Sequence, residues 1–193
     1  MTTQRKADLL LVLITGFWGC SYYLSDLALG EMPPFALCAM RFLLAFALLG
    51  IALFPKLRHI NRKTLLWAVP AGLSLTLTYI GATVGLLYTS ISNAGFICSL
   101  PAVTTPLLTF LLYRKKPERR MLLCLALCTV GLGLLTLGND FRPAPGDLIC
   151  LLCALGYGIN LLVVEHAVRQ PEVDALQLGV FQQLVTGAAM LVL

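Results

Sequence analysis

Charged side chains are scarce in this sequence. Only 12% of its 193 residues are Asp, Glu, Lys or Arg, whereas 59% are hydrophobic. A water-soluble domain needs more polar surface than this to cover its core. The composition therefore excludes an ordinary soluble fold and predicts an integral membrane protein.

Signatures of catalysis and metal binding are also missing. The sequence has only two histidines, no HExxH zinc motif and no glycine-rich phosphate loop. Its seven cysteines all lie inside apolar runs, and the CxxC at Cys150 and Cys153 has no second pair. We therefore expect no enzyme, no metal and no cofactor, and we interpret the cysteines as small buried apolar residues.

Long apolar runs fill most of the chain. A helix needs about 20 mostly apolar residues to cross a bilayer. Seven segments qualify: Leu9–Gly30, Phe35–Phe54, Leu65–Tyr88, Ala94–Tyr113, Met121–Gly138, Leu148–Val168 and Leu176–Leu193. Turn-forming residues such as proline, serine and asparagine separate them. The predicted fold class is an all-α integral membrane bundle with seven spans.

The basic residues predict the orientation of these spans. Twelve Lys and Arg residues fall on one side of the seven-span topology, and only Arg142 falls on the other. The positive-inside rule then places the N-terminus in the cytoplasm. The net charge of +5 is confined to short clusters between spans, so nucleic acid is not an expected partner. We expect a multi-pass protein of the plasma membrane, in bacteria the inner membrane, with membrane lipid around it.

The sequence contains an internal repeat. A shift of 139 residues superposes the first span on the sixth, with identities at Asp8/Asp147, Leu9/Leu148, Leu13/Leu152, Gly19/Gly158 and Ala28/Ala167. Five spans separate the copies, and because five is odd the second copy enters the membrane from the opposite side. Inverted repeats are typical of secondary transporters.

We predict a first five-helix repeat at 1–140 and the first two helices of a second at 147–193. The chain then lacks about three spans of a full pair, and we expect it not to transport unless it pairs with another chain.

Several short stretches resemble a known family. They are Phe17-Trp18-Gly19-Cys20-Ser21, Ala39–Ala45, Tyr88–Gly95 running on to Pro101 and Pro106, and Gly131-Leu132-Gly133. In this order and spacing the chain resembles the drug/metabolite transporter superfamily, specifically permeases with two EamA-type domains. The resemblance implies a ten-helix bundle around a central cavity that moves small metabolites, amino acids or drugs. Many relatives carry a Glu-Arg pair after the fourth span, where this chain has Arg114-Lys115-Lys116-Pro117-Glu118, so the subfamily stays open.

Arg41 is the most informative residue within the predicted spans. It lies six residues after Phe35, or roughly 9 Å along a helix. An arginine at a bilayer centre costs about 2.5–3.5 kcal/mol on insertion scales. We interpret Arg41 as an anion clamp in a cavity or as an ion-pair partner of Asp26, and snorkelling to the outer headgroups is the alternative. Asp26 and Glu165, which the repeat superposes, are either proton carriers or solvated residues at the ends of their spans.

Polar and aromatic side chains also occur near the middle of the spans. The candidates for lining a solute cavity are Trp18, Ser21, Tyr79, Tyr157, Asn160, Gln182 and Gln183, together with Arg41. Buried amides in hydrocarbon need partners, so the Asn and Gln side chains are expected to face protein or water. Gln182 and Gln183 point about 100° apart on a helix, so at most one faces a cavity squarely. Hydrogen bonding between helices is the alternative role for each candidate.

Proline and glycine mark two further features. Pro101 and Pro106 bracket the middle of the fourth span, and each frees the carbonyl four residues earlier. They form either a gate in a kinked helix or a static kink. Gly81 and Gly85 form a GxxxG pair, which predicts close contact between helices, within the bundle or in a homodimer.

Two classes of function fit these features. The first is a secondary transporter that moves a small-molecule solute by alternating access, driven by a solute or proton gradient. The second is a lipid-flipping protein or a non-transporting membrane scaffold. A lateral opening lined by Arg41 favours the lipid, and a closed central cavity favours the soluble solute.

Overall fold

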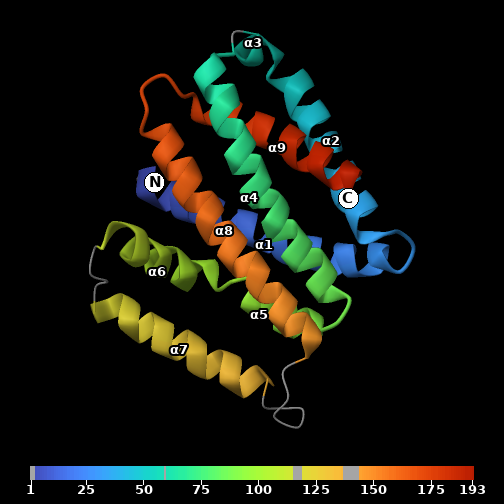
Figure 1. The fold of residues 1–193 in the computed structure, drawn as a ribbon, viewed down its shortest axis with the longest axis vertical. Helices are drawn as coiled ribbons and strands as arrows, with labels where there is room; N and C mark the ends of the chain where they lie inside the picture. Colours follow the sequence, from blue (N-terminus) through green and yellow to red (C-terminus); the bar gives the residue numbers. More distant parts are fainter. Residues whose placement is uncertain (1–2, 59, 115–118, 137–143) are drawn as a thin grey trace.

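A computed structural model describes residues 3–58, 60–114, 119–136 and 144–193. This part of the chain is helical and contains no strand, which confirms the predicted all-α fold class. The helices are α1 (Thr3–Leu29), α2 (Pro34–Ala52), α3 (Phe54–Leu57), α4 (Arg62–Leu86), α5 (Ile91–Ile97), α6 (Pro101–Tyr113), α7 (Arg119–Thr136), α8 (Pro145–Val168) and α9 (Ala175–Val192). Figure 1 shows α4 and α8 side by side at the centre of the bundle.

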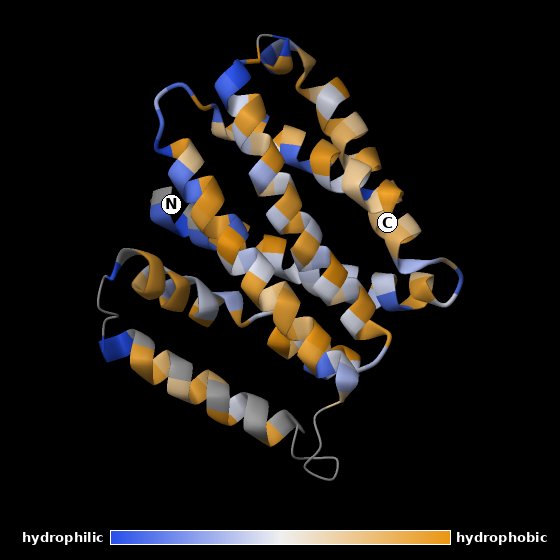
Figure 2. Cartoon of the chain, viewed as in Figure 1, coloured by the Kyte–Doolittle hydropathy of each residue, from blue (hydrophilic) through white to orange (hydrophobic). Residues whose placement is uncertain are grey.

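Six stretches of the described chain are long and apolar enough to cross a membrane, and α5 with α6 counts as one of them. Figure 2 shows hydrophobic residues along the helices and hydrophilic residues gathered at helix ends and loops. Large apolar side chains face outward, as Val12 does with 72% of its surface exposed. This pattern is that of a multi-pass membrane protein, whose outer surface contacts lipid.

The remaining predicted span, 121–138, is helical as α7 over Arg119–Thr136. Its last two residues lie outside the described part of the chain, as do His59, Arg142 and the basic segment 115–118. The predicted contribution of these basic residues to membrane orientation therefore stays a prediction.

Side chains placed at the helix starts satisfy free backbone N–H groups. Asn61 accepts a hydrogen bond from the Lys63 N–H at 3.2 Å and so caps the start of α4. Asp174 accepts hydrogen bonds from the Leu176 and Gln177 N–H groups, each at 2.9 Å, and caps the start of α9. The Asp147 carboxylate accepts from the Ala144 N–H at 2.9 Å in the first turn of α8. Such caps fix where a helix begins, because its first four N–H groups have no partner within the helix.

Glycines let α4 approach α8 at backbone distance. A methyl group added at Gly81 would overlap the backbone nitrogen of Cys153, and one added at Gly85 would lie 3.1 Å from the nitrogen of Cys150. From the other side, a methyl group at Gly156 would lie 2.8 Å from the Thr78 nitrogen. The close contact predicted for the GxxxG pair is therefore confirmed, and it lies within one chain.

The buried side chains of α4 include several hydroxyl groups, which form hydrogen bonds. Thr64, Ser74, Thr76, Thr78 and Thr83 are all buried on this helix. The Thr76 hydroxyl donates to the Gly72 carbonyl at 2.8 Å, and the Thr78 hydroxyl donates to the Ser74 carbonyl at 2.9 Å. Small hydroxyl side chains bonded to their own helix keep its surface narrow, so neighbouring helices pack closely.

The fourth predicted span, expected as a kinked helix, is broken into the two helices α5 and α6. Regular α-helix ends at Ile97 and begins again at Pro101, the first residue of α6. The ring of Pro101 clashes with a continuing helix, and proline is well suited to a first helical position. The Ile97 carbonyl, expected to be free, accepts from the Leu100 N–H at 3.1 Å instead.

The helix bounds agree with the proposed repeat. Adding 139 to the last residue of α1, Leu29, gives 168, where α8 ends. The same shift moves α2 from 34–52 to 173–191, and α9 spans Ala175–Val192. α2 and α9, the two superposed helices, pack against each other. The division into repeats at 1–140 and 147–193 itself stays a prediction.

The Gly81→Leu substitution is expected to destabilise the bundle. Its side chain has no space against α8, and overpacking costs about 1–3 kcal/mol or more. Gly16→Leu on α1 is the matched control, because a methyl group there meets nothing within 4 Å. Thermal unfolding in detergent, followed by size-exclusion chromatography, measures both. Equal melting temperatures for the two variants would contradict this packing.

Candidate functional site around Arg41

Arg41 on α2 binds two serines of α1. Its Nη1 donates to Ser25 Oγ at 2.8 Å, and its Nη2 donates to Ser21 Oγ at 2.7 Å. The two serines are four residues apart and thus lie on one face of α1. Ser25 also donates to the Ser21 carbonyl at 2.6 Å, which orients its hydroxyl oxygen toward the guanidinium. The predicted residues Arg41 and Ser21 therefore meet in the structure.

Aromatic rings from four helices surround this contact. The Arg41 Cζ lies 5.9 Å from the centroid of the Tyr79 ring on α4, a cation–π distance. Tyr79 packs edge-on against Phe42 with ring centroids 4.6 Å apart. Tyr157 on α8 packs, like Tyr79, against the apolar cluster that contains Phe42. Its ring meets the ring of Trp18 on α1 edge-on, with the two centroids 5.9 Å apart. Four of the predicted cavity residues thus lie around one region of the bundle.

The guanidinium of Arg41 has no carboxylate partner within the described residues. The two ion pairs found there are Lys63–Glu172 and Arg169–Glu165. The Asp26–Arg41 ion pair offered by the sequence is therefore not formed in this structure. Glu165 is exposed and pairs with Arg169 one helical turn later, as expected of a solvated residue at the end of its span. Among the described residues, the positive charge of Arg41 is thus contacted by the neutral groups of Ser21, Ser25 and Tyr79 alone.

Asn160 joins α8 to α4. Its Nδ2 donates to the Ala71 carbonyl at 2.8 Å and to Ser74 Oγ at 3.2 Å, and the residue is 5% exposed. Ser74 lies one turn after Pro70, whose carbonyl its hydroxyl also reaches at 2.9 Å. Asn160 therefore makes the interhelical contact that was the alternative to lining a cavity.

Three buried side-chain oxygens have no hydrogen-bond partner in the described structure. They are Oε1 of Gln182, Oε1 of Gln183 and Oγ1 of Thr105. An unsatisfied buried acceptor costs about 1–3 kcal/mol. A hydroxyl, amide or ammonium group of a solute would satisfy such an oxygen, which keeps Gln183 a candidate for solute binding.

The two prolines of the fourth span differ in position. Pro101 begins α6 and so belongs to the break, whereas Pro106 lies inside α6. Next to the break, the Thr104 hydroxyl donates to the Ala154 carbonyl of α8 at 2.9 Å. This hydrogen bond holds the start of α6 against α8. Whether the break moves as a gate stays a prediction.

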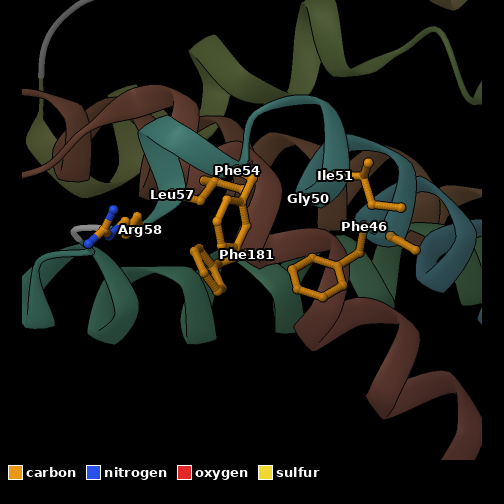
Figure 3. A pocket seen from close by; sticks show the side chains of 8 residues that line it. Phe46, Gly50, Ile51, Phe54, Leu57, Arg58 and Phe181 are labelled. Carbon is orange, nitrogen blue, oxygen red and sulfur yellow. The ribbon is translucent and has the colours of Figure 1, made fainter.

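A cavity of about 710 Å³ lies away from Arg41, between α2, α3 and α9. Its lining is almost entirely apolar, with Phe46, Phe54 and Phe181 facing inward and Arg58 at one end, as Figure 3 shows. No residue predicted for the site lines it. An open apolar groove on the outside of a membrane bundle is suited to contact with lipid.

Sequence reasoning missed two sets of contacts. Ser25 was not proposed, although its spacing of four from Ser21 on the span next to Arg41 indicates a shared face. Asp147 was noted only for its place in the repeat. Its carboxylate also accepts hydrogen bonds from the Thr89 hydroxyl and from Asn93 Nδ2, and so ties the start of α8 to the turn before α5.

Asn160→Leu tests the structural role of this amide. We expect a loss of stability of about 0.6–1.7 kcal/mol, the range measured for hydrogen bonds between helices in membranes. Reversible unfolding in mixed micelles measures it. Unchanged stability together with altered solute selectivity would instead make Asn160 a cavity residue.

Comparison with known proteins identifies the family of this chain. The model of the EamA-like transporter family matches residues 5–137. An "Uncharacterized transporter" from Archaeoglobus fulgidus is 32% identical over 163 residues, which cover 84% of this chain and 50% of that protein. The chain thus spans about half the length of this curated relative, and no solved structure matches it. With its apolar helical spans, the chain is a multi-pass membrane protein that belongs to the EamA-like transporter family.

Proposed function

We propose that the natural polypeptide containing these residues is a secondary transporter that moves a small solute bearing a carboxylate or similar anionic group. The observation that carries this proposal is the Arg41 guanidinium, which neutral serines hold without a carboxylate in the described structure. Guanidinium has five N–H donors, and the two bonds to Ser21 and Ser25 leave donors free for an anion.

The surrounding rings define the rest of the proposed solute. Trp18, Tyr79 and Tyr157 offer apolar faces near the cation. Trp18 is 52% exposed, so about half of its surface is left uncovered by the described helices. A solute with an anionic group and an apolar or aromatic body, such as an amino acid or an organic acid, matches this combination of groups.

Alternating access is the proposed mechanism because of the repeat. α8 packs along α4. Within the described residues, α1, which superposes on α8, has no comparable partner helix and a largely exposed surface. In a complete pair of inverted repeats, the third helix of the second copy would cover α1 as α4 covers α8. Two such halves around a shared site can rock against each other.

The lipid-flipping alternative receives less support. Its expected mark is a lateral opening lined by Arg41, but the apolar cavity between α2, α3 and α9 does not include this residue. The contacts of Arg41 face α1 and α4. These positions favour a solute held between helices over a lipid headgroup entering from the side.

Arg41→Gln is expected to lower transport of carboxylate solutes by about 10- to 100-fold. The estimate follows from losing a charge-assisted hydrogen bond of about 1.5–3 kcal/mol. Glutamine keeps a donor for the serines of α1. Uptake of a panel of amino acids, organic acids and amines into proteoliposomes containing the complete natural polypeptide measures the effect.

Arg62→Gln is the control for this variant, because Arg62 is exposed at the start of α4. It is expected to transport as the unmodified protein does. Equal losses for carboxylates and for neutral solutes in Arg41→Gln would show a structural role instead. Unchanged carboxylate transport would overturn the proposal.

The proposed orientation has the N-terminus in the cytoplasm of a plasma membrane. Two exposed positions at opposite ends of α4 test it: Arg62, which begins the helix, and Ser92, just beyond its end. In intact cells, a membrane-impermeant maleimide is expected to label Ser92→Cys and to spare Arg62→Cys, both made in a background without reactive cysteines. The reverse pattern would invert the topology.

A further inference from the structure

Three cysteines lie near the break between α5 and α6. Cys98 directly follows the last residue of α5, while Cys150 and Cys153 lie one turn apart on α8. The Cys98 side chain packs against the buried apolar cluster that contains Cys150. Nothing in the proposed transport site uses this cluster.

The three thiols differ in accessibility. Cys150 is fully buried and Cys153 is 4% exposed, whereas Cys98 is partly exposed. Cys150 packs with Ile97, Leu86 and Ala94 in one apolar cluster, and Cys98 packs against that cluster. A reagent therefore meets Cys98 first, and Cys150 belongs to the cluster against which the modified side chain packs.

The backbone around Cys98 differs from that of α8. Residues 98–100 lie outside regular helix and are held by short-range bonds, such as Ser99 N–H to the Phe96 carbonyl at 3.0 Å. Cys150 is instead anchored, because α8 is fixed at backbone distance against Gly85 of α4. A disulfide requires the two sulfurs to approach to about 2.05 Å, and the irregular segment, rather than the packed α8, is the side that would shift.

We propose that Cys98 and Cys150 are a thiol–disulfide pair whose oxidation fastens the break between α5 and α6 to α8. With an aromatic disulfide as the oxidant, Cys98 attacks one sulfur and forms a mixed disulfide while the first thiopyridone leaves. Cys150 then attacks the Cys98 sulfur, and the second thiopyridone leaves. Both cysteine protons end on the released thiopyridones, so the two thiols are oxidised and the reagent disulfide is reduced.

The pair is a device separate from the proposed transport function. Among the described residues, no group of three or more His, Cys, Asp or Glu side chains is arranged to hold a metal ion. The disulfide would hold residues 98–100 in the position seen here. Any motion of the broken span would then require reduction first.

Oxidation of the natural polypeptide in membranes with 4,4′-dithiodipyridine tests the pair. After remaining thiols are blocked with N-ethylmaleimide, mass spectrometry of proteolytic peptides is expected to find Cys98 linked to Cys150. Dithiothreitol is expected to remove the link. Mapping of the unmodified sequence does not depend on any variant folding correctly, and it does not require transport.

Three single serine variants complete the experiment. Cys153→Ser is the matched control, since it removes a buried thiol one turn away and is expected to keep the Cys98–Cys150 link. Cys98→Ser and Cys150→Ser are expected to lose it entirely. A stable mixed disulfide at Cys98, a link between Cys150 and Cys153, or no reaction at any of the three would overturn the proposal.

Discussion

The backbone contact between α4 and α8 supports the rest of this bundle. Lipid is as apolar as the helices themselves, so burial of apolar surface contributes little to holding them together, and close packing of small residues takes its place. Gly81, Gly85 and Gly156 supply that closeness, and any larger side chain at these positions would meet backbone atoms of the facing helix. The contact also sets the positions of Tyr79 and Tyr157, whose rings pack on the same apolar cluster. The aromatic surroundings of Arg41 therefore depend on glycines that never touch it.

Polar groups inside the bundle fall into two kinds. Most are satisfied locally: threonines of α4 bond to their own helix, and Asn160 bonds across to the Ala71 carbonyl. A few in the described part of the chain are left with free capacity, namely the guanidinium of Arg41 and the side-chain oxygens of Thr105, Gln182 and Gln183. The first kind stabilises the fold at little cost. Leaving polar groups of the second kind without partners in a membrane costs free energy. A polar solute that binds to them would recover part of that cost.

Much of this architecture was predictable because the bilayer restricts what a chain can do. Runs of about 20 apolar residues must form helices, and the described helices follow the predicted spans to within a few residues. The GxxxG pair on the third span also correctly predicted a close contact between helices. The fourth span was predicted as a kinked helix but is two helices, since a proline at position 101 is compatible either with a kink or with a new helix start. Asn160 shows a similar ambiguity, because an amide in mid-span suits a cavity and a helix contact equally well.

By itself, the sequence determined the membrane environment, the positions of the long apolar helices to within a few residues, and the family. Hydropathy, proline and glycine act locally along the chain, so these properties need no knowledge of neighbours. Only the tertiary structure decided which side chains meet: Arg41 with Ser21 and Ser25 rather than Asp26, Asn160 with α4, and Cys98 with the cluster that contains Cys150. Such pairings depend on the rotation and depth of each helix relative to the next. These are set by the fit of residues distant in sequence, such as Gly81 against the backbone at Cys153.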